Sequence, residues 1–266
     1  MIQLAHESPL FAFDEVQAVT DYDYALVHLF EENPEYFDKF VQAREKGRHI
    51  ILDNSIFELG EAFNADEFKK WIEILKPTEY IVPDVLENAE RTVANMQNWI
   101  PDAPGKIIGV VQGKTYDEIC WCYKEIEPFV DKVAISFDYS YYNNQFPAQP
   151  KLKAWTLGRK QLLQDLVKDS IINISKPHHL LGASLMWEFI GYKEKYPWIE
   201  SIDTSNPVMW AIDKGPYPKN VYEIEDKPNT KLFTLMNWVP HKETLRKTIT
   251  EDIVFNINKF KSICND

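Results

Sequence analysis

The chain has 266 residues, which suits one large domain, since single α/β barrels typically run to about 250 residues. Apolar residues make up 45% of the sequence and aromatic residues 14%, so the composition predicts a buried core and excludes a disordered chain. With 29 basic and 41 acidic residues the net charge is −12, which disfavours a protein that coats nucleic acid through a global positive field.

The N-terminal segment and the cysteines bear on location. The segment MIQLAHESPLFAF lacks the regions of a signal peptide, and no run reaches the roughly 18 apolar residues of a membrane span. The cysteines, Cys120, Cys122 and Cys264, are odd in number, and two of them lie one residue apart, which predicts free thiols in a reducing compartment. We therefore expect a cytoplasmic protein without membrane contact.

Eight β-rich runs follow one another along the chain. They are IQLA (2–5), YALVHLF (24–30), HIILD (49–53), EYIVPD (79–84), KIIGVVQ (106–112), KVAISFD (132–138), HHLLGA (178–183) and IESID (199–203). Apolar spacing predicts helices over 65–76, 88–100, 115–130 and 184–196. Alternating strands and helices predict parallel strands with right-handed crossovers. Eight strands favour a single (β/α)8 TIM-type barrel over residues 1–266, rather than an open doubly wound sheet.

Two segments depart from this alternation. After the sixth strand, residues 139–177 hold an extended insertion, YSYYNNQFPAQP and then a helical stretch, KLKAWTLGRKQLLQDLVKD. Such a segment is either a lid that contacts the substrate or a decorated surface loop. Residues 214–266 form a C-terminal extension with turns at KGPYPKN and KPNT, an apolar run, KLFTLMNWV, and a terminal helix over 241–262.

The active site of such a barrel lies at the C-terminal ends of its strands. Gln112 and Gly182 lie at these ends, together with four carboxylates, Asp53, Asp84, Asp138 and Asp203. Any one carboxylate could simply cap the next helix. Four that converge raise one another's pKa, so one can stay protonated while another is ionised. This combination favours chemistry at an anomeric carbon, where one carboxylate attacks and another handles the proton of the leaving group.

Other chemistries fit the sequence less well. No G-x-x-x-x-G-K-[ST] or G-x-G-x-x-G motif is present among only nine glycines, which disfavours nucleotide hydrolysis and dinucleotide redox chemistry. Cys120 and Cys122 point apart on a helix and lack a second ligand pair, so we predict no metal or other cofactor. His178 and His179 face opposite sides of a strand, so at most one faces the barrel mouth, and packing or helix contact is the predicted role.

A local basic groove remains compatible with the acidic net charge. Its candidate nucleic-acid contacts are Lys114, Arg159, Lys160, Lys214 and Lys219. The alternative is that these side chains only keep the surface soluble.

The strand-end motifs resemble those of the tRNA-guanine transglycosylase superfamily, in the same order and with similar spacing over most of the barrel. The segment Asp53-Asn-Ser-Ile-Phe57-Glu58 resembles the family's D-S-G-G-F/Y-Q, and Gly109-Val-Val-Gln112-Gly113 resembles G-I-V-Q-G. His179-Leu-Leu181-Gly182 is similar to Y-L-M-G, and Ile202-Asp203-Thr-Ser-Asn-Pro207 is similar to F-D-x-x-x-P.

The resemblance implies a double displacement. Asp203 would attack C1′ of a guanosine-type nucleotide and expel guanine, and a 7-deazaguanine base such as preQ0 or preQ1 would then restore the glycosidic bond. Asp53 would move or orient the protons.

The resemblance also implies how the base is held. Phe57 and Leu181, with Gly182 beside it, would enclose the base between two faces, while Asp84 and Gln112 would hydrogen-bond its edge.

The sequence departs from the family in ways that bear on the polymer. The zinc motif C-x-C-x-x-C is absent, the family's Thr-Arg is here Val208-Met209, and KVAISFD lacks the Gly-Gly of the family's sixth strand. The chain thus looks most like the zinc-free 7-deazaguanine DNA transglycosylases of phages and bacteria. This favours DNA over tRNA, and it is compatible with a protein of phage origin that acts in the host cytoplasm.

Three alternatives stay open. The chain could act on tRNA instead, it could hydrolyse a nucleoside or glycoside with the same carboxylates, or it could be a non-catalytic barrel that binds nucleic acid. The net charge also leaves room for a partner protein that supplies the grip on nucleic acid.

Overall fold

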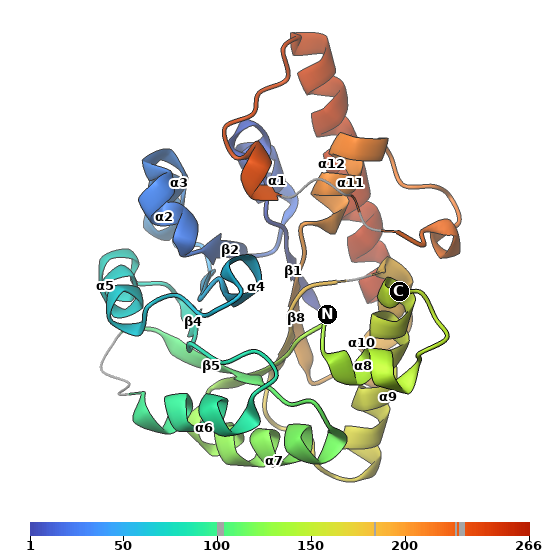
Figure 1. Ribbon diagram of the computed structural model, residues 1–266. Helices are drawn as coiled ribbons and strands as arrows, with labels where there is room; N and C mark the ends of the chain where they lie inside the picture. The colour runs from blue at the N-terminus through green and yellow to red at the C-terminus, as the bar shows by residue number, and fades with distance from the viewer. Residues whose placement is uncertain (100–103, 184, 227, 229–231) are drawn as a thin grey trace.

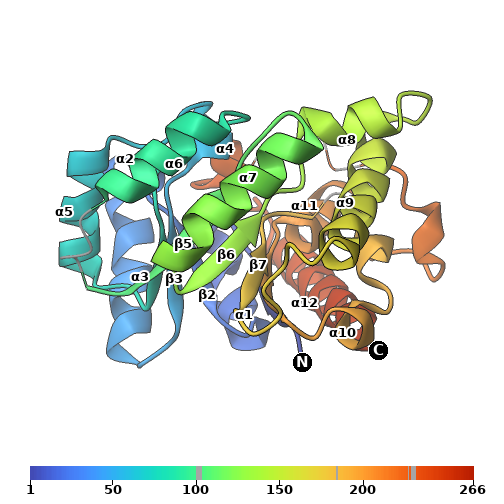
Figure 2. The ribbon, with the colours of Figure 1, turned by 90° about the horizontal axis from the view of Figure 1, so that it is seen from below.

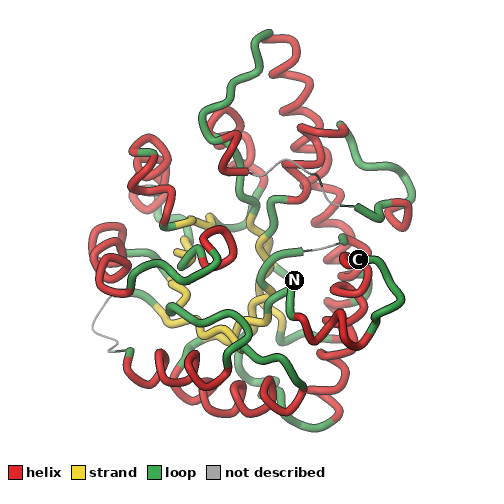
Figure 3. The backbone as a smooth tube through the Cα atoms, in the orientation of Figure 1, coloured by secondary structure: helices red, strands yellow, loops and turns green. Residues whose placement is uncertain are grey.

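The computed structural model describes residues 1–99, 104–183, 185–226, 228 and 232–266. Its centre is a ring of eight parallel strands surrounded by helices (Figures 1 and 3). The strands are β1 (Gln3–Ala5), β2 (Asp23–Leu26), β3 (Ile50–Asp53), β4 (Glu79–Ile81), β5 (Lys106–Val111), β6 (Lys132–Ile135), β7 (His178–Leu180) and β8 (Ile199–Asp203). Hydrogen-bonded neighbours follow the order β1-β8-β7-β6-β5-β4-β3-β2. The predicted (β/α)8 TIM-type barrel is confirmed.

Turn residues close the seam between β1 and β2, for which the described residues show no strand ladder. The backbone N–H of Asp21 donates to the carbonyl of Leu4 at 2.9 Å, and the Leu4 N–H donates to the Asp21 carboxylate at 2.9 Å. The hydroxyl of Thr20 donates to the same Leu4 carbonyl at 2.8 Å. Backbone groups that an open edge would leave unpaired are thereby satisfied.

Helices α3 (Pro34–Glu45), α5 (Ala65–Leu75), α6 (Ala89–Asn98) and α7 (Tyr116–Ile126) cover the outside of the ring (Figure 2). Because helices cover one side and packed side chains fill the other, whole strands such as β3 are buried, which explains their continuous apolar runs. Asn64, Asn88 and Thr115 cap α5, α6 and α7 by accepting backbone N–H groups of the first turn.

The insertion and the C-terminal extension add further helices. Residues 139–177 hold α8 (Ser140–Gln145) and α9 (Lys151–Lys168), so the predicted helical stretch is confirmed. The extension begins within α11 (Asn206–Lys214) and ends in α12 (Glu243–Asn265), which packs against α11. The predicted terminal helix is thus confirmed, and it ends later than expected. The remaining helices are η1 (Leu10–Ala12), α1 (Phe13–Val19), α2 (His28–Glu32), α4 (Ile56–Leu59), η2 (Glu127–Phe129), η3 (Met186–Phe189), α10 (Tyr192–Lys195), η4 (Val221–Glu223) and η5 (Leu232–Leu235).

Two predicted elements were wrong in part. The run 24–30 is not one strand, because β2 ends at Leu26 and α2 takes up the second half. The pattern over 184–196 is not one helix, because Gly191 adopts a left-handed conformation, with φ 77°, between η3 and α10. Residue 184, and residue 100 of the helix predicted over 88–100, lie outside the described residues.

None of the helices in the described ranges combines the length and the apolar character needed to cross a bilayer.

Candidate active site

A cavity of about 490 Å³ opens at the carboxyl ends of the strands. This volume is typical of small-molecule sites, which span about 300–1,000 Å³. Every residue to which the resemblance assigns catalysis or base binding lines it: Asp53, Phe57, Asp84, Gln112, Leu181, Gly182 and Asp203. Ring closure therefore brings the predicted site residues together.

The cavity is strongly acidic. Six carboxyl groups line it, those of Glu7, Asp53, Glu58, Asp84, Asp138 and Asp203. The described lining residues include no lysine or arginine. Sequence reasoning missed two of these carboxyl groups as site residues. Glu7 lies two residues beyond β1, so the strand-end rule could have found it, and Glu58 follows Phe57 within a motif that was already singled out.

Burial and mutual repulsion raise the pKa of several of these carboxyls. Burial is the main cause for Asp53, whose pKa lies well above its usual range, and the charges of Glu58 and Asp203 add to it. Burial, followed by the charge of Asp203, likewise raises the pKa of Glu7 well above its usual range. Glu58 also lines the cavity, and desolvation raises its pKa to about 7. Protonated and ionised carboxyls therefore coexist near neutral pH.

Asp53 ends β3 and shapes the turn that follows it. One carboxylate oxygen, Oδ2, accepts the backbone N–H of Ser55 at 2.9 Å, and Ser55 has a left-handed backbone with φ 59°. The side chain of Asn54 braces the same turn, because its Oδ1 accepts the N–H of Ile56 at 3.0 Å. The turn leads into α4, whose Phe57 lines the cavity with 54% of its surface exposed.

Asp84 is held by two amide side chains. Gln112 Nε2 donates to its Oδ2 at 2.7 Å, and Asn54 Nδ2 donates to its Oδ1 at 2.8 Å. The other end of Gln112 accepts the backbone N–H of Glu87 at 2.8 Å. Burial raises the pKa of Asp84 to about 6 in spite of these hydrogen bonds, which lower it. Each carboxylate oxygen keeps a second lone pair, so a donor on the edge of a flat ligand can still bind there.

Asp203 ends β8 with one oxygen fixed. Its Oδ1 lies 2.9 Å from Nε2 of His179 and accepts the Gly182 N–H at 3.1 Å, whereas Oδ2 has no hydrogen-bond partner among the described residues. Nδ1 of His179 lies 2.8 Å from the hydroxyl of Ser201. When Asp203 is ionised, Nε2 must carry the proton of this pair, since a carboxylate only accepts. The free Oδ2 is the oxygen available for attack on a ligand.

The two histidines of β7 differ in role. His178 faces outward, where its Nε2 lies 2.9 Å from the Tyr123 hydroxyl of α7, as the predicted helix contact requires. His179 is fully buried inside the ring and stacks on Tyr24, as the predicted packing role requires, and its Nε2 also contacts Asp203, which was not predicted.

The predicted basic groove does not form at the cavity. Arg159 is fully buried and pairs with Glu188 at 2.7 Å, so its prediction as a nucleic-acid contact was wrong. It lies on the inner face of α9, between Trp155 and Leu162, where the helix packs on the barrel. Lys160 is half-buried and donates to the Glu188 carbonyl at 3.0 Å. The other candidates are exposed and do not line the cavity: Lys114, Lys214 and Lys219.

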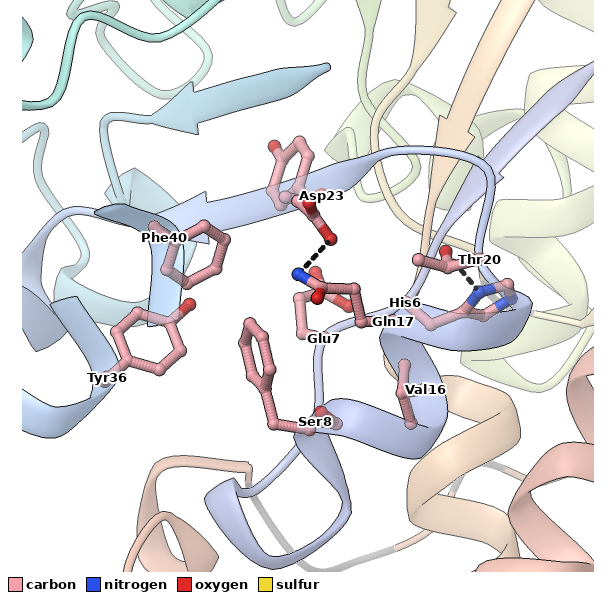
Figure 4. Close-up of a pocket in the computed structure, with 11 residues that line it drawn as sticks. His6, Glu7, Ser8, Val16, Gln17, Thr20, Asp23, Tyr36 and Phe40 are labelled. Atoms are coloured by element: carbon pink, nitrogen blue, oxygen red, sulfur yellow. Dashed lines mark hydrogen bonds between the residues drawn. The ribbon is translucent and has the colours of Figure 1, made fainter. Parts of the chain in front are cut away.

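A far smaller crevice of about 10 Å³ lies among β1, α1 and β2 (Figure 4). His6 and Thr20 are hydrogen-bonded on one side of it at 3.1 Å, and Gln17 donates to Asp23 at 3.3 Å across it. This volume has room for about one water molecule. Glu7 lines both spaces, so the crevice backs onto the main cavity.

Neither the protein-family models nor the curated proteins match the chain, so these comparisons assign it to no family.

The three cysteines form no disulfide. In the parts of the chain that the structure describes, no group of three or more His, Cys, Asp or Glu side chains is arranged to hold a metal ion. The prediction that the protein uses no metal or other cofactor stays a prediction.

The raised pKa of Asp84 makes stability depend on pH. Its ordinary pKa is 3.8 and its folded value is about 6, so the folded state binds more protons between these limits and the free energy of unfolding falls as pH rises. Asp84→Asn removes this contribution. Between pH 4 and pH 7, the free energy of unfolding measured with denaturant should fall by roughly 2.4 kcal/mol more in the wild type than in the variant. Parallel curves would contradict the buried state of this carboxyl.

Proposed function

We propose that this chain is a base-exchange transglycosylase, which replaces guanine in nucleic acid, DNA in preference to tRNA, with a 7-deazaguanine. The observation that carries the proposal is the convergence of the motif residues on one cavity, with Asp203 presenting a free oxygen beside the buried Asp53. Cleavage at an anomeric carbon needs such a pair, one carboxylate that attacks and another that handles the proton.

In the first displacement, Oδ2 of Asp203 attacks C1′ as the C1′–N9 bond breaks, and the electron pair leaves with guanine. Asp53, protonated because its pKa is raised, donates a proton to the departing base, so neutral guanine leaves and a pentosyl ester remains on Asp203.

In the second displacement, N9 of the 7-deazaguanine attacks C1′. The incoming base gives its N9 proton to the Asp53 carboxylate, and Asp203 departs as a carboxylate. Both aspartates thereby return to their starting states.

Base binding uses the remaining residues of the cavity. Phe57 and Leu181 offer two apolar surfaces to a flat heterocycle, and Asp84 and Gln112 offer acceptors and donors for its edge. A base within a polymer must leave its stack to reach them.

The charge of the cavity wall indicates which part of a nucleic acid the cavity can hold. Because its described lining lacks lysine and arginine, the cavity suits a neutral base and a sugar rather than a phosphate. The phosphate backbone is then held outside the cavity or by a partner protein. DNA is favoured over tRNA because the sequence lacks the zinc motif and the Thr-Arg pair of the tRNA enzymes.

The same carboxylates support a second candidate function, hydrolysis of a nucleoside or glycoside. One of the six acidic side chains of the cavity would then activate a water molecule in the second step, in place of an incoming base.

A guanine-release assay separates these functions. Duplex DNA, single-stranded DNA, tRNA and the free nucleosides guanosine and deoxyguanosine, each labelled in guanine, are incubated with and without preQ0 or preQ1. We expect guanine release from DNA, in which any release beyond one equivalent of the protein depends on the added base. Release from free nucleosides without any acceptor would favour the hydrolase, and no release from any substrate would contradict both enzymes.

Replacing the nucleophile tests its role. Asp203→Asn keeps the shape but removes the attacking carboxylate, so we expect the rate of guanine release to fall by at least about a thousandfold. The control is Asp38→Asn, at an exposed position outside the cavity, which should keep the wild-type rate. Equal rates in the two variants would remove Asp203 from the nucleophile's role.

Stacking on Phe57 predicts a loss of affinity without a loss of stability. Because 54% of its surface is exposed, Phe57→Ala should leave the melting temperature unchanged. It should weaken guanine binding by about 1–3 kcal/mol, which is roughly a 5- to 150-fold rise in Kd measured by calorimetry. Phe255→Ala on α12, with 50% of the residue exposed, is the matched control. An unchanged Kd for Phe57→Ala would rule out stacking.

A further inference from the structure

We propose that Arg159 of α9 is a positioning residue for Asp203, and that it acts through the single peptide group joining Leu181 to Gly182. This inference rests on the proposed function in one respect, since it takes Asp203 as the nucleophile. Arg159 itself lies outside the cavity and does not touch the substrate.

The geometry of that peptide group carries the inference. Nη1 of Arg159 donates to the carbonyl of Leu181 at 2.9 Å, and the N–H of Gly182 donates to Oδ1 of Asp203 at 3.1 Å. This carbonyl and this N–H belong to one planar trans unit, so they point in opposite directions. The unit is therefore a rigid bridge with a guanidinium at one end and the nucleophile at the other.

Such a bridge has an electrostatic effect as well as a steric one. A peptide group carries a dipole of about 3.5 D, and here its positive end faces the Asp203 carboxylate while its negative end faces the cation of Arg159. Hydrogen bonds in series polarise one another, by perhaps 10–30% per bond. The cation thus strengthens the N–H bond that fixes Oδ1.

Arg159 also fixes the backbone of the loop that contains this peptide group. Gly182 has a left-handed backbone with φ +63°, and a Cβ there would lie only 2.4 Å from the ring of Phe137. A second donor of Arg159, Nη2, binds the Gly182 carbonyl at 2.9 Å. One guanidinium therefore binds two consecutive backbone carbonyls. These two hydrogen bonds fix Leu181, which is proposed to pack against the base, and they also fix the Gly182 N–H that binds Asp203.

Glu188 in η3 fixes the guanidinium in turn. Its Oε1 lies 2.7 Å from Nε of Arg159, its Oε2 lies 3.1 Å from Nη2, and both residues are fully buried. The planar fork of arginine makes this two-point contact, which a lysine cannot reproduce. Buried ion pairs often contribute little net stability against well-packed apolar residues. The orientation of the loop is thus the effect that the pair provides most directly.

The test removes the pair without leaving an unpaired buried charge, by the double substitution Arg159→Met and Glu188→Met. The matched control is another buried ion pair, Lys132 with Glu79 at 2.6 Å, changed to methionine in the same way. Lys132 also contacts Glu200 at 2.8 Å and Glu79 contacts His49 at 3.5 Å, but both of these partners are partly exposed, so water can solvate them in the control. These two residues begin β6 and β4, at the end of the barrel away from the cavity. Only variants that remain folded, as judged by circular dichroism, are compared.

The rate of the first chemical step is measured in single turnovers on guanine-containing duplex DNA. We expect the Arg159/Glu188 double variant to form the covalent adduct at least tenfold more slowly, with KM for the DNA within threefold of wild type. The Lys132/Glu79 control should keep the wild-type rate. A wild-type rate in the folded Arg159/Glu188 variant, or an equal loss in the control, would overturn the proposal.

A second measurement is independent of activity. Hydrogen exchange of the Gly182 amide, followed by NMR, should be slow in the wild type and at least tenfold faster in the Arg159/Glu188 variant. If the wild type forms no adduct with any nucleic acid but this amide responds as expected, the proposed function fails and the positioning of the Asp203 carboxylate stands. An amide that exchanges at the same rate in both proteins would overturn the positioning role, whatever the activity.

Discussion

Closure of eight parallel strands into one ring is the constraint on which the site depends. The carboxyl ends of all strands then meet at one mouth, so residues far apart in sequence, such as Asp53 and Asp203, face a common cavity. The same closure removes water from the carboxyls gathered there. Their raised pKa values follow from this desolvation and from the lack of a cation among the described residues of the cavity wall.

The two proposed catalytic carboxyls are held in different ways, and this difference separates their roles. Asp203 has one oxygen fixed by His179 and Gly182, which leaves the other free to attack. Asp53 is buried among other acidic groups, and this burial and repulsion favour its protonated form, although the one backbone N–H that it accepts lowers its pKa. In both cases a residue with a left-handed backbone, Gly182 or Ser55, shapes the adjoining turn, which holds one of the two proposed base-binding side chains, Leu181 or Phe57.

The strand ends could be read from the sequence because buried parallel strands are short apolar runs, each closed by a polar residue such as Asp53 or Gln112. The sequence does not indicate which residues of a strand point into the ring, because both faces of these strands are buried. For this reason the position of His179 beside Asp203 was not predicted. Arg159 was placed on the surface because arginine is rarely buried unless paired, and its partner, Glu188, lies far along the chain. Gly191 precedes α10 and separates it from η3, where apolar spacing alone predicted one continuous helix.

The role proposed for Asp203 requires a covalent bond between its carboxylate and a pentose. Peptide mapping by mass spectrometry, after acid quenching of the protein with guanine-containing duplex DNA in the absence of an incoming base, would detect this bond. We expect a deoxyribosyl ester on the peptide that contains Asp203, with loss of guanine from the DNA. An ester on Asp53 or Glu7, or guanine release with no protein-bound sugar, would contradict this role.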